Sequence, residues 1–341
     1  MVGIVYALLS AALFGVSTPF AKNLLGGASP WLLAGLLYCG SGVGLAIVRL
    51  LWRSKEAGLS RRDLPWLAAA VLSGGVAGPV LLLFGLARTA AADASLLLNL
   101  ESVFTLVMAW VVFKENVDRR LMMGAVAIVA GAIVLSWPSG ASLEPSWGPV
   151  LIAGACLAWA IDNNLTRKVS AADPMQIAMV KGLVAGAANV AIALLLGAAW
   201  PSGPVLAQAG LLGFLSYGVS LTLFVLALRH LGTARTGAYY ALAPFIGAGT
   251  AILLLGEPVT TAFIAGGVLM AIGLWLHLTE QHQHAHEHEP MEHEHVHVHD
   301  AHHQHAHAPG TPPEPHVHRH RHGRLLHRHP HYPDLHHRHT H

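Results

Sequence analysis

One glutamate stands in the middle of a strongly apolar stretch, and its chemistry needs an explanation. The stretch Ser95–Val107 reads SLLLNLESVFTLV and has Glu101 near its centre. A carboxylate at the centre of a lipid-spanning segment costs roughly 2.5 to 3.5 kcal/mol on insertion scales, so such residues usually face a polar path. There a carboxylate can bind a cationic group or carry a proton. Glu101 is therefore the leading candidate for a functional acid.

Polar side chains accompany Glu101 at helical spacing. On a continuous helix that turns about 100° per residue, Ser95, Asn99, Ser102 and Thr105 fall on the same side as Glu101. The pattern predicts one wettable face, which we interpret as the wall of a cavity. The alternative is a structural role, in which the carboxyl group ties two helices together.

Lys181 lies well inside another apolar stretch and is the expected partner of Glu101. If both faced one cavity, their opposite charges would suit a zwitterionic, amino-acid-like solute. Lys181 is also close enough to the end of its stretch to extend its amine to the lipid headgroups. Both interpretations stay open.

Further candidates lie on other apolar stretches. Asp162, Asn163 and Asn164 are consecutive, so they sweep about 200° of a helix and cannot all face one cavity. We expect a local break or a wet helix end there, with Asp162 as a second acid of the site and Asn163 beside it. Tyr217, Tyr239 and Tyr240 add hydroxyl groups and aromatic faces, although tyrosines also anchor helices at membrane interfaces.

The elements that must position these residues are membrane-spanning helices. The chain is 54% hydrophobic and 11% charged although its last part is strongly polar, so the apolar residues are concentrated upstream. Stretches of about 20 apolar residues recur about ten times, and each is long enough to cross roughly 30 Å of hydrocarbon. The predicted fold class is all-α and integral to the membrane. The expected spans are 2–20, 31–51, 64–87, 91–113, 121–137, 147–165, 177–200, 206–228, 238–255 and 262–278.

Basic residues alternate between the loops, and this predicts the topology. Cytoplasmic loops retain Lys and Arg, so loops rich in them are expected in the cytoplasm. Both termini are then cytoplasmic in a multi-pass protein of the cell membrane. The segment 138–146 has no basic residue and leaves five spans on each side, an odd number that inverts the second half. We predict two inverted five-helix repeats, 1–138 and 146–279, able to alternate access to a central site. The basic residues of the cytoplasmic loops are Arg53, Lys55, Arg61, Arg62, Lys114, Arg119, Arg120, Arg167, Lys168, Arg229 and Arg235.

Two segments at corresponding places in the halves carry a resemblance to a known family. They are ARTAAADASLLLNLESVFTLVMAWVVFKE (87–115) and ALAPFIGAGTAILLLGEP (241–258). With the five-plus-five layout, residues 1 to 279 resemble the drug/metabolite transporter superfamily with two EamA-type repeats. The resemblance implies transport of small molecules, often efflux, with substrates too varied to transfer. The proline common early in the fourth helix of such a repeat is matched by Pro244, whereas Ser102 replaces it in the first half.

From Glu280 onward the chain is polar and rich in histidine. The segment 280–341 has too few apolar residues for a core, so we predict a disordered cytoplasmic tail. Imidazoles at alternate positions with acids between them suit divalent Ni, Zn, Co or Cu. The alternatives are a response of the histidines to pH and a tether of the arginines to anionic lipid. The expected metal ligands are His282, His284, His286, His288, His293, His295, His297, His299, His302, His303, His305 and His307.

Three functions follow from these features. The first is a secondary transporter of a small metabolite that needs no cofactor and has a metal-binding or metal-responsive tail. The alternatives are a divalent metal transporter for Ni, Co or Zn, and a membrane metal sensor that transports nothing. The spans have no HExxH, paired-aspartate or Ser-His motif, so no enzyme is expected. A net charge of +2 gives no reason for a nucleic-acid partner, and a homodimer is left open.

Overall fold

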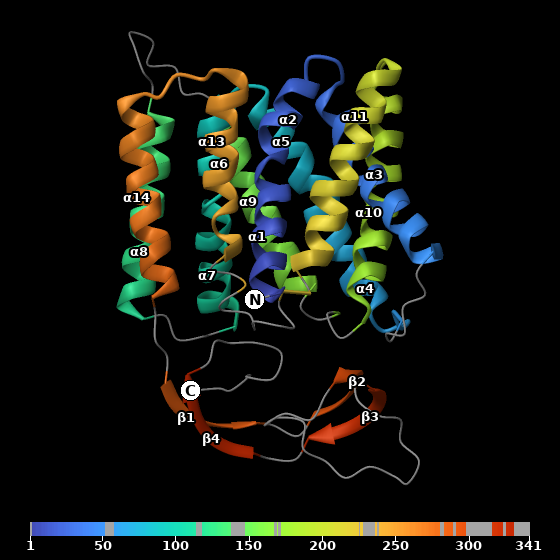
Figure 1. Ribbon diagram of the computed structural model, residues 1–341, viewed down its shortest axis with the longest axis vertical. Coiled ribbons are helices and arrows are strands. Elements are labelled where there is room, and N and C mark those ends of the chain that lie inside the picture. Colours follow the sequence, from blue (N-terminus) through green and yellow to red (C-terminus); the bar gives the residue numbers. More distant parts are fainter. Residues whose placement is uncertain are drawn as a thin grey trace.

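The chain forms a bundle of roughly parallel helices (Figure 1). A computed structural model describes residues 2–51, 58–113, 118–137, 147–166, 169, 172–224, 226–227, 236 and 239–279, and four strands between 283 and 330. The helices of the first half are α1 (Val2–Gly15), α2 (Ser17–Leu24), α3 (Pro30–Leu51), α4 (Leu64–Ala70), π-helical η1 (Val71–Ala77), α5 (Gly78–Leu86), α6 (Ala91–Leu97), α7 (Leu100–Phe113) and α8 (Arg119–Ser136). Those of the second half are α9 (Trp147–Thr166), α10 (Pro174–Leu195), α11 (Gly203–Gly213), π-helical η3 (Phe214–Val219), α13 (Ala243–Leu255) and α14 (Thr261–Leu278).

These helices account for the ten expected spans. Among the described residues, 8 helical segments are long and apolar enough to cross a membrane. The other two expected spans correspond to α9, which ends in the polar Asp162–Thr166 segment, and to the shorter apolar helix α13. The prediction of an all-α integral membrane fold is confirmed.

The contacts between helices follow a two-fold pattern. The second helix of one half packs against the second of the other, as α3 on α10, and the fifth against the fifth, as α8 on α14. The fourth helices meet likewise, as α6 on α13. The contact of α5 with α9 has its counterpart in the contact of η3 with α1. Two pseudo-symmetric halves would produce this arrangement, while the limits 1–138 and 146–279 stay predictions.

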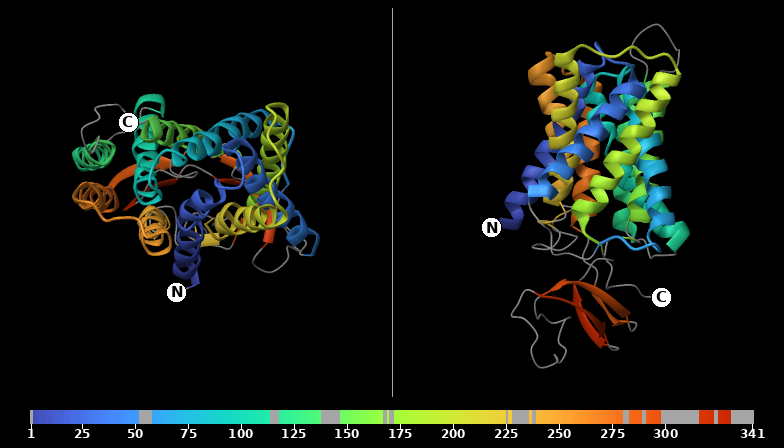
Figure 2. Two further views of the ribbon diagram at one scale, coloured as in Figure 1. Left: turned by 90° about the horizontal axis from the view of Figure 1, so that it is seen from above. Right: turned by 90° about the vertical axis from the view of Figure 1, so that its right-hand side faces the viewer.

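Glycines let two of these cross-half pairs approach closely. Seen from above, the α8–α14 pair lies at one end of the bundle and the α3–α10 pair at the other (Figure 2). A Cβ added to Gly42 of α3 would lie 2.7 Å from the carbonyl carbon of Gly182 of α10. A Cβ added to Gly131 of α8 would lie 2.8 Å from the carbonyl oxygen of Gly266 of α14. Van der Waals contact between backbones thus joins helices from opposite halves.

Several spans are interrupted at corresponding places. The third span of each half contains a π-helical segment, η1 or η3. The fourth span has a turn at Leu98 and Asn99, between α6 and α7, and the corresponding span of the second half has a turn at Ala241 and Leu242 before α13. The expectation of one continuous helix over 91–113 is therefore wrong. The interruption occurs although Ser102 replaces the family proline.

In the tail, four segments form paired strands where the sequence predicts disorder. Strand β1 (Gln283–His288) pairs with β4 (Leu325–Pro330), and β2 (Met291–His297) pairs with β3 (His316–His322), both antiparallel. Such pairs are made by backbone hydrogen bonds, which need no apolar core. Disorder in the rest of 280–341 stays a prediction. Of the expected metal ligands, His282, His299, His302, His303, His305 and His307 lie outside the described residues.

The close approach of α3 and α10 can be tested at Gly42. We expect Gly42→Ala to lower the free energy of unfolding by about 1–3 kcal/mol, because the added methyl group would overlap backbone atoms of α10. Thermal unfolding in detergent, followed by tryptophan fluorescence, would measure the change. The matched control is Gly249→Ala in α13, where an added Cβ meets nothing within 4 Å. Equal melting temperatures for the two variants would contradict the close contact.

Candidate functional site

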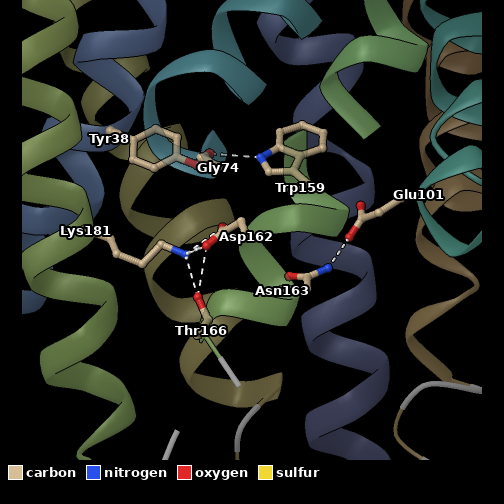
Figure 3. A network of polar contacts seen from close by, with 8 residues as sticks. All are labelled: Tyr38, Gly74, Glu101, Trp159, Asp162, Asn163, Thr166 and Lys181. Carbon is tan, nitrogen blue, oxygen red and sulfur yellow. Dashed lines mark hydrogen bonds and ion pairs between the residues drawn. The ribbon is translucent and has the colours of Figure 1, made fainter. Parts of the chain in front are cut away.

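Helix α9 carries a buried ion pair toward α10. Asp162 is buried, and the amine of Lys181 lies 2.6 Å from each of its carboxylate oxygens. Thr166, one turn further along α9, donates its hydroxyl to Asp162 at 2.9 Å and accepts a hydrogen bond from Lys181 at 3.4 Å (Figure 3). The expectation that Lys181 pairs with Glu101 is therefore wrong, and its amine does not extend to the headgroups. Asp162, expected as a second acid of the site, is neutralised within the protein.

The π-helical segment η1 provides the surface on which Asp162 lies. Gly74 has no side chain, and a Cβ there would overlap the carboxyl group of Asp162. The carbonyl oxygen of Gly74 accepts hydrogen bonds from the Tyr38 hydroxyl at 2.7 Å and the Trp159 indole at 3.0 Å. The next carbonyl, of Gly75, accepts from the side-chain amide of Asn189 at 3.0 Å. The altered helix turn is thus tied to α3, α9 and α10 by side chains that satisfy its carbonyl groups.

Asn163, the residue after Asp162, contacts α7 rather than α10. The side-chain amide of Asn163 donates to a carboxylate oxygen of Glu101 on α7 at 2.7 Å (Figure 3). A helix turns about 100° per residue, so Asp162 and Asn163 point to different partners. Glu101 is partly exposed and Asn163 is exposed. In the described part of the chain the ion pairs are Lys181–Asp162 and Arg49–Asp173, so the partner of the Glu101 carboxyl group there is an amide and not a cation.

Helix α9 itself differs from expectation at this point. It continues without a break through Asn164 to Thr166. The side-chain amide of Asn164 donates to the carbonyl oxygen of Ala160 at 2.8 Å, one turn earlier in the same helix. The three consecutive polar residues are therefore accommodated by separate partners on a regular helix. Of the two expected alternatives, the local break is wrong, whereas a wet helix end is compatible with the exposed Asn163 and the end of α9 at Thr166.

The polar residues near Glu101 do not form the continuous face that their spacing predicts. Asn99 is buried, and its side-chain amide donates to the carbonyl oxygen of Leu96 at 2.8 Å. Ser102 donates its hydroxyl to the carbonyl oxygen of Asn99 at 2.7 Å. Both side chains are thus bonded to carbonyl groups of the turn between α6 and α7, which also accept backbone amides. Thr105 is partly exposed on α7, and a role for it in the site stays a prediction.

Aromatic rings from α1, α3, α9, η3 and the residues before α13 meet beside these polar groups. The ring of Phe14 on α1 lies 5.9 Å from Tyr217, 5.7 Å from Tyr240 and 6.5 Å from Trp159, measured between centroids. Tyr38 lies 5.5 Å from Tyr217. Phe14, Tyr217 and Tyr240 are partly exposed, whereas Tyr38 and Trp159 are buried. We call these five residues the aromatic cluster.

Sequence reasoning found only part of this cluster. Tyr217 and Tyr240 belong to it as expected, whereas the described ring contacts do not include Tyr239. The sequence does not point to Phe14, Tyr38 or Trp159, because an aromatic residue in an apolar span is ordinarily a core or lipid-facing residue. The one signal was indirect, since Trp159 lies one turn before Asn163 on α9. Sequence spacing within a helix does not show which residues of other helices it faces.

Comparisons with known proteins agree with a membrane transporter. The EamA-like transporter family matches residues 1–137 and 146–279. An uncharacterized transporter from Methanothermobacter thermautotrophicus is 28% identical over 293 residues, which cover 80% of this chain and 85% of that protein. A probable amino-acid metabolite efflux pump from Salmonella typhimurium is 27% identical over 203 residues, which cover 54% of this chain and 66% of that protein.

A solved structure shows the same fold. It is described only as a crystal structure of a protein, and it superposes with a TM-score of 0.62 at 16% sequence identity. The superposition covers 81% of this chain and 96% of that one. At this identity the likeness concerns the arrangement of the helices and nothing of the substrate.

The ion pair of α9 and α10 should be important for stability. We expect Lys181→Met to lower the free energy of unfolding by about 3–5 kcal/mol, because the substitution leaves the buried carboxylate of Asp162 without its counter-charge. The double variant Asp162→Asn/Lys181→Met removes both charges and should recover most of the loss. Thermal unfolding in detergent measures both effects. An additive double variant, as unstable as the sum of the single changes, would rule out this coupling.

Proposed function

Because the chain belongs to the EamA-like transporter family, we propose that it is a secondary transporter that moves a small organic solute across the cell membrane by alternating access. The two-fold pattern of helix contacts supports this proposal, because related halves can expose a central site to either side in turn. We place both termini in the cytoplasm, as the basic residues of alternate loops indicate.

The solute that fits the described residues best carries an ammonium group. Lys181 is engaged by Asp162, so the charge that remains beside the aromatic cluster is that of Glu101. A carboxylate attracts an ammonium ion, and the faces of neighbouring aromatic rings add cation–π attraction. The relative named as a probable amino-acid metabolite efflux pump supports an amino-acid-like metabolite and outward transport. The observation that carries the proposal is that the carboxyl group of Glu101 is partly exposed and has no cationic partner among the described residues.

Glu101 also provides a means of coupling. One carboxylate group cannot hold a proton and an ammonium ion at the same time, so its protonation and its binding of the solute exclude each other. A proton that enters from one side would release the solute, and deprotonation would restore the site. Asn163 donates to one oxygen of Glu101 and leaves the other for this exchange.

Metal transport has less support from the helices. In the described part of the chain there is no group of three or more His, Cys, Asp and Glu residues that could hold a metal ion. His277, which lies in α14, contacts the carbonyl oxygen of Leu121 at 3.0 Å. Metal binding by the tail, and the sensor that it would serve, stay predictions.

Replacement of the acid tests the proposed function. We expect Glu101→Gln to reduce proton-coupled exchange of amines and amino acids in proteoliposomes by roughly 100-fold or more, because the amide can neither attract an ammonium ion nor release a proton. The control is Asp63→Asn, the same chemical change in the loop before α4, where Asp63 accepts hydrogen bonds from Ser60. If the Glu101→Gln protein exchanges these solutes at the rate of the unmodified protein, Glu101 is a structural acid.

Removal of the tail separates the two roles proposed for metals. A protein ending at Thr279 should exchange the metabolite at an unchanged rate, because the described contacts of the site are made by residues of α7, α9 and α10. It should lose the binding of Ni²⁺ and Zn²⁺ that we expect of the full chain, measured by isothermal titration calorimetry. A truncated protein that loses uptake of Zn²⁺ while the full chain transports it would favour the metal transporter.

A further inference from the structure

The turn between α5 and α6 is held by a lysine from another helix. The turn lies at the face of the bundle opposite the start of the chain, which we call the far face (Figure 1). Lys22, near the end of α2, donates to the carbonyl oxygens of Leu86 at 2.6 Å and Thr89 at 2.9 Å. These carbonyl groups close α5 and begin the turn, where the helix dipole is negative and a cation is favoured.

A glutamate from the second half holds the other side of the same turn. Glu257 accepts hydrogen bonds from the backbone amides of Ala91 and Ala92, each at 2.7 Å and each on a different carboxylate oxygen. These amides open α6 and have no partner within that helix. The residue before Glu257 is Gly256, whose φ of 64° ends α13 in the left-handed conformation and directs the chain toward α6. An anion from one half is thus bonded to a helix end of the other.

Burial differs sharply on the two sides of the break in this span. Six of the seven residues of α6 are buried, and Asp93 is partly exposed. On α7, by contrast, Glu101, Ser102 and Thr105 are partly exposed, and Val107 is exposed. The span is therefore packed within the protein where it approaches the far face and less buried toward the face at which the chain begins.

The same span connects Glu257 to Glu101. Helix α6 runs from the amides that Glu257 holds to the turn at Leu98 and Asn99, and Glu101 is the second residue of α7 beyond that turn. A displacement of α6 would therefore change the position of the turn and of Glu101. The contact of Glu257 with α6 and the proposed site at Glu101 therefore lie on the same interrupted span.

We propose that Glu257 and Lys22 form a clamp that keeps the far face closed, and that release of α6 from Glu257 opens the site of Glu101 to that face. The proposal rests on the proposed alternating access and adds the contact that decides which side is open. The Glu257 contact crosses between the halves, whereas Lys22 holds a turn of its own half, so the hydrogen bonds of Glu257 must break when α6 moves away from the end of α13 at this face. Two charge-assisted hydrogen bonds, on one side chain, make that break a discrete step.

The accessibility of Glu101's neighbour tests the clamp. In a background of Cys39→Ala and Cys156→Ala, a reporter Ser102→Cys is treated with a membrane-impermeant maleimide, added to the far side in sealed vesicles. We expect slow labelling of the clamped protein and a rise of roughly tenfold or more with Glu257→Ala, because the bias toward the closed state is lost. Lys22→Met should act in the same direction. Glu257→Gln, which keeps one acceptor, should give an intermediate rate.

The matched control is Arg88→Ala in the same turn. Arg88 is exposed, and its guanidinium donates to the carbonyl oxygen of Phe84 in its own helix, so its loss should leave the labelling rate unchanged. Labelling of the same cysteine from the opposite side, together with monodisperse elution, shows that each variant is folded. The clamp is overturned if the far-side labelling rate stays at the wild-type value in folded Glu257→Ala, Glu257→Gln and Lys22→Met proteins. It is also overturned if this rate rises equally in Arg88→Ala.

This experiment needs no solute, so it separates the clamp from the identity of the substrate. If far-side labelling rises with Glu257→Ala while Glu101→Gln leaves exchange unchanged, the clamp stands and the proposed role of the acid fails. If labelling does not rise while Glu101→Gln abolishes exchange, the acid stands and the clamp fails.

Discussion

A backbone group inside a bilayer has no water to bond with, and this constraint organises the polar residues of the bundle. At η1 and at the turn between α5 and α6, side chains from other helices and from the end of α13 bond to backbone groups that have no helical partner. Tyr38 and Trp159 satisfy the carbonyl of Gly74 in η1, while Lys22 and Glu257 satisfy the two ends of the α5–α6 turn. Polar side chains that look like a wet surface in the sequence are therefore, in large part, the partners of an interrupted backbone.

Against that background Glu101 differs from the other intramembrane charges. Asp162 and Lys181 neutralise each other at 2.6 Å, and Glu257 is engaged by two backbone amides. Among the described residues Glu101 has an amide as its partner, and it remains partly exposed beside the aromatic cluster. Burying a carboxylate in a low-dielectric region without a cationic partner costs free energy. Such a cost is consistent with a residue that exchanges a proton for a solute, as proposed for Glu101.

The sequence predicts the helices well, because hydropathy over 20 residues is a property of one segment. It singles out Glu101 for the same reason, and the role of this acid stays a prediction. It does not predict which helix faces which. The isolated charges of Lys181 and Glu101 suggest a pair. The helical rotation of α9 instead directs Asp162 to Lys181 on α10 and Asn163 to Glu101 on α7. The break at Leu98 and Asn99 also escaped, because no proline or glycine marks it. Partners across helices depend on rotation and packing, which a single sequence does not record.

The glycine contacts of α3 with α10 and of α8 with α14 have a consequence for how the bundle can move. Each pair joins the two halves along backbone atoms that touch, so neither pair can slide or part without losing contact over much of its length. We therefore expect the α3–α10 and α8–α14 pairs, at the two ends of the bundle, to stay fixed. Motion is left to the interrupted spans between them, whose π-helical segments and turns can act as joints. The segments that can move are therefore shorter than a five-helix repeat, and they come from both halves.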